Sequence, residues 1–315
     1  MEKNARIYVA GHRGLVGSAL CKRLQEGGYR NVITRTSREL DLRRQADVEA
    51  FFAQERPEYV FLAAAKVGGI LANNTYKAEF IYDNIMIAAN VVNASYGFGV
   101  KKLLNLGSSC IYPKLSPQPM KEEHLLTGPL EPTNEPYAIA KISAIKLCHY
   151  YNMQYGTNYL SVMPTNLYGP NDNFDLETSH VLPALLRKFH EAKIAQAPEV
   201  MLWGTGEPFR EFLHVDDLAD ACVFLMEKYG PKDTGEFINI GTGEDIRIGD
   251  LASLVSEIVG FRGKIINDFS KPDGTPKKLL DVSRMLALGW KASTPLRRGV
   301  EDTYTWYRNS LVRVS

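Results

Sequence analysis

The stretch Ile7-Tyr8-Val9-Ala10-Gly11-His12-Arg13-Gly14-Leu15-Val16-Gly17 decides the fold. Four apolar residues run into a G-x-x-G-x-x-G pattern, and helical periodicity follows from Leu15 to Gln25. Glycines at such a strand-to-helix turn let the backbone curve tightly and approach a phosphate, to which the helix N-terminus offers free N–H groups. The stretch therefore predicts a dinucleotide site, although a glycine turn used only for packing would have the same pattern.

The first half of the chain alternates short apolar runs with helical patterns. Strands separated by helices form βαβ units with right-handed crossovers, so the fold class is α/β, a Rossmann-type doubly wound parallel sheet. The expected strands cover Ile7–Ala10, Asn31–Arg35, Tyr59–Ala64, Lys102–Leu106 and Tyr159–Met163, and the expected helices cover Leu15–Gln25, Arg44–Glu55, Phe80–Tyr96 and Pro136–Tyr155.

After Pro164 the pattern changes to loops rich in Pro, Gly and Asn. We expect residues 1–165 to form the cofactor-binding domain, with a return to its sheet near residues 210–245. Residues 166–315 should form a smaller C-terminal α/β lobe that binds the substrate and is interleaved with the first domain. Further helices are expected near His180–Ala195, Asp217–Lys228, Ile248–Val259 and Leu296–Arg308.

Size and composition exclude several classes of protein. The chain has 315 residues, enough for a full hydrophobic core, and a formal net charge of +1, which argues against nucleic-acid or membrane binding. No apolar run approaches the roughly 20 residues of a membrane-spanning helix, and the N-terminus lacks a signal-peptide pattern. The four scattered cysteines show no CxxC pair. We therefore expect a cytoplasmic protein with reduced thiols and no metal site.

The end of the second expected strand bears on the choice of cofactor. An NAD site usually has an acidic residue there, which holds both ribose hydroxyls. This chain has hydroxyls and arginines instead: Arg35, Ser37 and Arg38 could bind a 2′-phosphate, and Arg13 could reach it from the glycine loop. NADP(H) is therefore favoured over NAD(H), unless the arginines are only a solvated strand end. Asp41-Leu42 follows, where an acidic side chain could meet the adenine amino group.

A second signal is the pair Tyr137 and Lys141, which share one face of a helix because they lie four residues apart. A nearby ammonium makes the phenol a better acid near neutral pH. The lysine can also bind the nicotinamide ribose. Ser108 directly follows the fourth strand, at the edge where open α/β sheets bind ligands, so we expect it to hydrogen-bond a substrate carbonyl together with Tyr137. The spacing alone would also suit a plain amphipathic helix.

Taken in this order, the glycine loop, the strand-end serine and the Tyr-x-x-x-Lys pattern resemble the extended short-chain dehydrogenase/reductase family. Finer motifs are similar to members that act on nucleotide-sugars, and their resemblance implies 3,5-epimerisation of GDP-4-keto-6-deoxy-D-mannose followed by NADPH-dependent reduction of the 4-ketone. The segments that carry these resemblances are Ala63–Ile70, Gly107–Pro113, Glu131–Ala138, Pro164–Pro170, Ser179–Leu185, Arg210–Asp217 and Asn239–Gly243.

The resemblance also implies roles for single residues. Cys110 and His180 would form the acid–base pair of the epimerisation, and Tyr137 would protonate the 4-oxygen. By residue type alone, Cys110 would more simply be a small buried hydrophobe, and His180 a capping residue. Contacts with the GDP-sugar would come from Lys188, Trp203, Arg210 and Asp273. Lys188 stands where the family often has arginine, so it keeps the charge and loses the bidentate fork.

The full set of expected cofactor contacts combines the motifs above with those that the resemblance adds. It comprises Gly11, His12, Arg13, Gly14, Leu15, Val16, Gly17, Arg35, Ser37, Arg38, Asp41, Leu42, Leu106, Gly107, Ser108, Ser109, Tyr137, Lys141, Pro164, Thr165, Asn166, Leu167 and His180. The resemblance further implies a homodimer, formed through the helices over Phe80–Tyr96 and Tyr137–Tyr155.

Two other functions stay open at this point. A nucleotide-sugar 4-epimerase with bound NAD would be favoured by an acidic residue at the end of the second strand. An NADP-binding regulator without catalysis would be expected to lose Tyr137, Lys141 or Ser108. A separate acid–base group of His214, Asp216 and Asp217 is also conceivable, although Asp217 precedes an apolar helical run and more simply caps and braces it.

Overall fold

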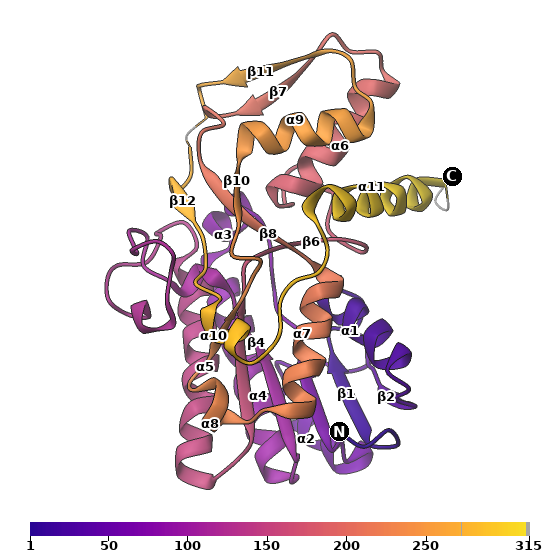
Figure 1. Cartoon of the computed structure of the whole chain (residues 1–315). Helices are drawn as coiled ribbons and strands as arrows, with labels where there is room; N and C mark the ends of the chain where they lie inside the picture. The colour runs from indigo at the N-terminus through magenta and orange to yellow at the C-terminus, as the bar shows by residue number, and fades with distance from the viewer. Residues whose placement is uncertain (272, 313–315) are drawn as a thin grey trace.

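The structure of the protein, a computed structural model, describes residues 1–271 and 273–312. A six-stranded parallel sheet lies in the lower half of Figure 1, and a smaller lobe lies above it. This arrangement confirms the doubly wound α/β sheet. The strand order is β2 (Asn31–Ile33), β1 (Arg6–Ala10), β3 (Tyr59–Leu62), β4 (Lys102–Leu106), β5 (Tyr159–Pro164) and β9 (Ile238–Ile240).

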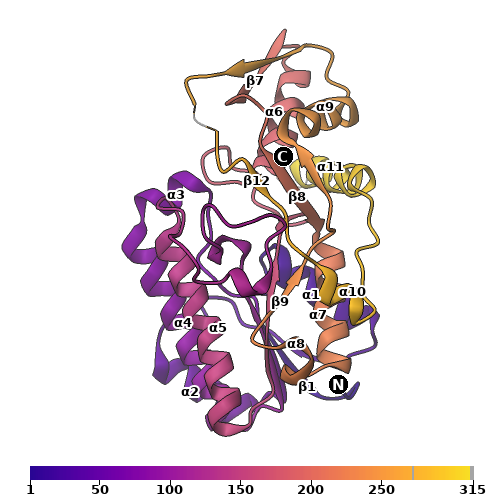
Figure 2. The same cartoon turned by 60° about the vertical axis from the view of Figure 1, so that its left-hand side comes forward.

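Helices cover both faces of this sheet, and strand β1 shows why. Its side chains alternate, so Ile7 and Val9 enter one apolar core while Tyr8 and Ala10 enter the other. Figure 2 shows the two helical layers on opposite sides of the strands. One layer contains α1 (Leu15–Glu26) and α7 (Val215–Lys228), and the other contains α2 (Gln45–Glu55), α4 (Lys77–Gly97) and α5 (Glu135–Tyr155).

Local sequence signals explain where helix α5 begins and ends. Pro136 stands in its first turn, where a missing N–H costs no hydrogen bond. Gly156 follows its last residue with φ 66°, the left-handed conformation that often ends a helix. These limits place Tyr137 and Lys141 in the first two turns of α5, beside the carboxyl ends of the strands.

The smaller lobe is built around strand β8 (Phe209–His214), which carries Arg210 and Glu211. Strands β10 (Asp245–Arg247), β12 (Lys277–Lys278) and β6 (Asn166–Tyr168) all pair with β8, and β7 (Glu199–Trp203) pairs with β11 (Lys264–Asp268). The larger helices of the lobe are α6 (Val181–Ile194), α9 (Ile248–Val259) and α11 (Leu296–Val312). The remaining helical segments are α3 (Ile70–Thr75), α8 (Pro231–Thr234), α10 (Ser283–Ala287) and two short 3₁₀ turns, Ser109–Ile111 and Glu122–His124.

Two kinds of structure are absent from residues 1–271 and 273–312. No helix there combines the length and the apolar character that crossing a bilayer requires. The same residues contain no group of three or more His, Cys, Asp or Glu side chains that could hold a metal ion. All four cysteines are free thiols, of which Cys148 and Cys222 are buried.

Candidate active site

A cleft of about 1110 Å³ crosses the carboxyl ends of strands β1 to β5. This is the edge at which open α/β sheets bind their ligands. Every residue that the sequence predicts as a cofactor contact lines this cleft, from the glycine loop through Arg35, Asp41 and Ser108 to His180. The cleft therefore brings together the sequence signals of six separate segments, and their individual roles remain predictions.

The glycine loop has the geometry of a phosphate cradle. Gly11 has φ 85°, which strains any other residue, and a Cβ on Gly17 would meet the Gly11 carbonyl oxygen at 2.1 Å. Gly14 donates its N–H to that oxygen (3.0 Å) and is the N-cap of α1. His12 Nδ1 is buried and makes no hydrogen bond within the described chain, so a bound oxygen atom could satisfy it. These features fit a pyrophosphate at the start of α1.

The arginines predicted for the 2′-phosphate have different surroundings. The guanidinium of Arg35 donates to Glu55 Oε1 at 2.5 Å, so its charge is already compensated. Arg13 and Arg38 also line the cleft, and neither side chain makes a hydrogen bond or ion pair within residues 1–271 and 273–312. The cations left for a phosphate are therefore Arg13 and Arg38, with Ser37 beside them on the same rim.

Ser108, Tyr137 and Lys141 meet where strand β4 ends. Lys141 Nζ donates to the carbonyl oxygen of Leu106 (2.7 Å) and lies 5.6 Å from the centre of the Tyr137 ring. Burial raises the pKa of Tyr137, the neighbouring Ser108 acts weakly in the opposite direction, and burial lowers the pKa of Lys141 to about 8. At neutral pH the phenol is therefore a protonated donor beside a lysine that is largely charged.

Cys110 and His180 lie on different sides of this group. Cys110 lines a small hollow that shares Ser109 with the cleft. Burial raises the pKa of the Cys110 thiol, while the neighbouring Ser108 and the ammonium of Lys278 act in the opposite direction. His180 precedes α6 and lines the main cleft, and burial lowers its pKa, so its imidazole is neutral at pH 7. His180 can therefore exchange a proton with a ligand in the cleft, whereas Cys110 lines the adjacent hollow and not the cleft itself.

The four predicted substrate contacts lie outside this cleft, on the smaller lobe. Trp203, which is 58% exposed, has Lys188 Nζ 4.9 Å from its ring centre. Asp273 accepts hydrogen bonds from the backbone N–H (2.9 Å) and the hydroxyl (2.7 Å) of Thr205. Burial lowers the pKa of Arg210, and the charge of Asp273 opposes that shift. The structure thus groups these residues together on the smaller lobe.

Sequence reasoning missed Lys278, which connects the two groups. Lys278 in β12 lies opposite Arg210 in β8, and its ammonium acts on the Cys110 thiol. Burial lowers the pKa of Lys278. Its strand has two residues only, so no periodicity distinguishes Lys278 from the adjacent Lys277, which forms an ion pair with Asp245 (2.9 Å). Only the three-dimensional structure could assign it to the site.

His214, Asp216 and Asp217 brace helix α7. The ring nitrogen Nδ1 of His214 accepts the backbone N–H of Asp216 (3.3 Å), which caps the helix. Asp217 accepts hydrogen bonds from Ser293 Oγ (2.9 Å) and from the N–H of Thr294 (2.9 Å). None of the three lines the cleft, which agrees with the bracing interpretation rather than with a second acid–base group.

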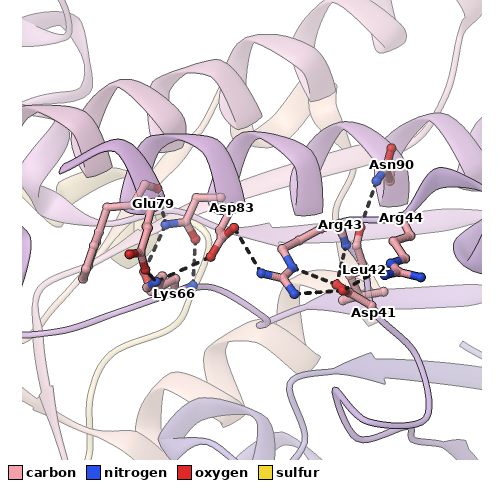
Figure 3. Close-up of polar contacts among 10 residues, drawn as sticks. Asp41, Leu42, Arg43, Arg44, Lys66, Glu79, Asp83 and Asn90 are labelled. Atoms are coloured by element: carbon pink, nitrogen blue, oxygen red, sulfur yellow. Dashed lines mark hydrogen bonds and ion pairs between the residues drawn. The ribbon is translucent and has the colours of Figure 1, made fainter. Parts of the chain in front are cut away.

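An ion-pair chain at the β2 side of the cleft was also not anticipated (Figure 3). Arg43 holds both carboxylate oxygens of Asp41, through Nε at 2.9 Å and Nη2 at 2.8 Å. Its third nitrogen lies 3.4 Å from Asp83 on α4. Lys66, in the loop after β3, pairs with the other oxygen of Asp83 (3.6 Å) and with Glu79. These ion pairs therefore join three segments that border the cleft: the loop after β2, the loop after β3, and helix α4.

Comparisons with known proteins extend this picture. Residues 7–241 match the NAD dependent epimerase/dehydratase family. The chain is 61% identical to GDP-L-fucose synthase 1 of Arabidopsis thaliana over 306 residues, covering 97% of this chain and 94% of that protein. It is 55% identical to GDP-L-fucose synthase of Escherichia coli (strain K12) over 308 residues, 96% of each chain. Among solved structures, the Campylobacter jejuni GDP-mannoheptose C4 reductase MlghC with NADP bound superposes with a TM-score of 0.92 at 42% identity, covering 98% of this chain and 99% of that one.

Proposed function

This chain belongs to the NAD dependent epimerase/dehydratase family, and we propose that it converts GDP-4-keto-6-deoxy-D-mannose to GDP-L-fucose. The reaction consists of 3,5-epimerisation followed by NADPH-dependent reduction of the 4-ketone. The observation that carries the proposal is the 61% and 55% identity, over nearly the whole chain, to two GDP-L-fucose synthases. The arrangement of proton donors at the end of β4 supports the same chemistry.

The cofactor is a nicotinamide dinucleotide, as expected for this family, and it supplies the hydride when bound. We infer NADP(H) rather than NAD(H), because Arg13 and Arg38 are unpaired at the rim of the cleft and no carboxylate ends strand β2. The N–H groups at the start of α1 would hold the pyrophosphate, and Lys141 would hold the nicotinamide ribose.

In the reduction, Tyr137 donates a proton to the 4-oxygen of the sugar. Its raised pKa keeps the phenol protonated until the ketone oxygen becomes basic enough to take that proton. Ser108 hydrogen-bonds the same oxygen, and the ammonium of Lys141 stabilises the tyrosinate that remains. The three residues thus act on one atom of the substrate.

In the epimerisation, a proton next to the ketone leaves from one face of the ring and another returns on the opposite face. Cys110 and His180 perform these transfers, and Ser108 and Tyr137 stabilise the enolate oxygen between them. The ammonium groups of Lys278 and Lys141 favour the thiolate of Cys110, which is the form of the sulfur that can take a proton from the substrate.

The substrate extends from Cys110 to the smaller lobe. Lys278 and Arg210 lie opposite each other and together suit a diphosphate, and the exposed Trp203 ring suits a nucleobase. This division of labour supports residues 1–165 as the cofactor domain and residues 166–315 as the substrate lobe, with β9 returning to the main sheet.

A homodimer stays part of this proposal. The helices that it would use expose large apolar or aromatic side chains, which a four-helix bundle between two copies would cover. These are Tyr82 and Tyr96 on α4, and Tyr150, Met153 and Tyr155 on α5. Light scattering at micromolar concentration would distinguish a dimer from a monomer.

Steady-state turnover of GDP-4-keto-6-deoxy-D-mannose with NADPH tests the function. NADPH oxidation should accompany formation of GDP-L-fucose, identified by NMR. Tyr137→Phe should lower kcat roughly 100-fold or more while the Kd for NADPH stays the same. Turnover of a UDP-sugar without net NADPH oxidation would instead identify a 4-epimerase. NADPH binding without turnover of any nucleotide-sugar would identify a regulator.

A further inference from the structure

The ion-pair chain in Figure 3 lies at the adenine end of the cofactor cleft. Strand β2 is the edge strand of the sheet, and β4, which Ser108 follows, lies three places away. A dinucleotide with its pyrophosphate at α1 and its nicotinamide near β4 must place its adenine beside β2. Leu42, Ala64 and Ile87 line the cleft at this end and offer apolar surface to a flat base.

The carboxylate of Asp41 is held in one orientation here. Its Oδ1 accepts the backbone N–H (3.1 Å) and Nε (2.9 Å) of Arg43, and its Oδ2 accepts Nη2 of the same guanidinium (2.8 Å). Two carboxylate oxygens offer about four lone-pair sites, so one acceptor position stays open on Asp41, which lines the cleft. A freely rotating carboxylate loses conformational entropy when it binds a ligand. Because Arg43 already holds the Asp41 carboxylate, this entropy cost of binding is smaller here.

Arg43 is itself anchored from the other side. Asp83 on α4, whose side chain is 14% exposed, lies 3.4 Å from Nη1 of Arg43 and also faces Lys66. The two carboxylates compensate the charge of the guanidinium. Arg43 therefore differs from Arg13 and Arg38, which are unpaired at the rim and suit a phosphate.

The backbone of this loop has a separate support. The buried side chain of Asn90 on α4 donates Nδ2 to the carbonyl oxygen of Leu42 (2.9 Å). Loss of the Arg43 side chain should therefore release the Asp41 carboxylate without moving the chain that carries it.

We propose that Arg43 is a positioning residue for the base of the cofactor. Its guanidinium, anchored by Asp83, fixes the Asp41 carboxylate as the acceptor for the 6-amino group of adenine. The inference rests on the proposed function only as far as that function requires a nicotinamide dinucleotide in the cleft. It makes the site selective for a 6-aminopurine over a 6-oxopurine, because the 6-oxo group would turn an acceptor toward the fixed carboxylate.

Fluorescence titration of the whole chain with three reduced cofactors tests this role. They are NADPH, NADH and the NADPH analogue in which hypoxanthine replaces adenine. Arg43→Met should raise the Kd for NADPH and for NADH by the same factor, roughly fivefold to tenfold, because both carry the 6-amino group. The Kd for the hypoxanthine analogue should stay within about twofold, and the preference for adenine should shrink accordingly.

Two further variants serve as controls. Arg44→Met is the matched control, since the Arg44 guanidinium lies 3.9 Å from the same carboxylate but its side chain is 74% exposed, and it should change none of the three constants. Arg38→Met should raise the Kd for cofactors that carry the 2′-phosphate and leave the Kd for NADH unchanged. Arg43→Lys keeps a charge without the fork and should retain part of the adenine preference.

An equal rise in the Kd for all three cofactors in Arg43→Met would overturn the proposal and show a general role in folding. A rise in the Kd for NADPH, with the Kd for NADH unchanged, would show instead that Arg43 binds the 2′-phosphate. If Arg43→Met unfolds, Asp83→Asn removes the anchor from α4 and must show the same base-dependent pattern. Because the readout is cofactor binding, a protein that never turned over the GDP-sugar would refute the proposed function and leave this test valid.

Discussion

The sulfur of Cys110 lies where burial favours the thiol and the ammonium groups of Lys278 and Lys141 favour the thiolate. A serine has nearly the same volume but a far less acidic hydroxyl, so Cys110→Ser should remove the proton transfer while preserving the packing. Incorporation of solvent deuterium at C3 and C5 of the substrate should fall roughly 100-fold or more. The Kd for NADPH should not change. Cys21→Ser on α1 is the control and should leave the exchange rate intact, and normal exchange in Cys110→Ser would remove Cys110 from the mechanism.

Lys141 predicts a pH dependence. Burial lowers its pKa to about 8 in the folded protein, below the ordinary value of 10.5. The charged form supports Tyr137, so kcat/KM for NADPH in the reduction should fall as pH rises through about 8.

The contribution of Lys141 to the free energy of unfolding should change with pH in the opposite direction, upward. Between about pH 8 and 10.5 the unfolded chain binds more protons at this site, so this contribution to the free energy of unfolding rises with pH.

Urea unfolding at several pH values checks the sign, with Lys141→Met as the reference that cannot titrate. The difference in the free energy of unfolding between the native chain and this variant should move in favour of the native chain above pH 8. A difference that does not change with pH would show that Lys141 keeps its ordinary pKa.

How far sequence alone could define the site differs from residue to residue. Ser108, Tyr137 and Lys141 were predictable because their signals are local, a strand end and an i, i+4 spacing. Lys278 was not, because its proximity to Cys110 depends on the pairing of β12 with β8, which no local pattern encodes. The ion pair that engages Arg35 was missed for the same reason, since Glu55 lies on the following helix.

At the scale of elements, periodicity predicted the long segments and failed on the short ones. Helix α9 has the predicted limits, whereas strand β2 ends at Ile33, two residues before the expected Arg35. Strand β2 has a single neighbour in the sheet, and its pairing with β1 stops at Tyr8 opposite Ile33. The strands of the smaller lobe were not predicted. Three of them, β6 and β10 with three residues and β12 with two, are shorter than the four to eight residues over which alternation can be read.

Helix α7 and strand β4 are joined by a buried lysine, which gives a prediction at this scale. Lys102 Nζ donates to the carbonyl oxygens of Leu225 (3.0 Å), Met226 (2.8 Å) and Tyr229, which lie where α7 ends. Lys102→Met keeps the apolar stem and removes all three bonds. The free energy of unfolding should fall by about 2 kcal/mol, with kcat unchanged.

Urea unfolding measures this loss. The adjacent Lys101 supplies the control, because its side chain is 51% exposed and pairs with Glu58 at the surface. Lys101→Met should cost less than about 1 kcal/mol. Equal effects of the two substitutions would show that the end of α7 does not depend on Lys102.

For the molecule as a whole, the buried carboxylate of Glu211 joins the main sheet to the smaller lobe. Glu211 belongs to β8 of the lobe. Its Oε1 accepts the N–H groups of Thr242 (2.7 Å) and Gly243 (2.8 Å), in the loop that follows β9 of the main sheet. Its Oε2 accepts the N–H of Leu280 (3.0 Å), two residues beyond Lys278. One side chain therefore fixes three segments around the region in which we place the diphosphate of the substrate.

Glu211→Gln tests this junction because it preserves shape and replaces one acceptor by a donor. Both oxygens of Glu211 accept backbone N–H groups, so either orientation of the amide sets donor against donor. The free energy of unfolding should fall by about 2–3 kcal/mol, and KM for the GDP-sugar should rise roughly tenfold as Arg210 and Lys278 shift. The Kd for NADPH should stay the same, because none of the three residues whose N–H groups the Glu211 carboxylate accepts lines the cleft. Glu207→Gln, at a side chain that is 69% exposed, should change none of the three quantities. Parallel losses of GDP-sugar and NADPH binding in Glu211→Gln would mean that the carboxylate supports the whole fold and does not specifically position the substrate lobe.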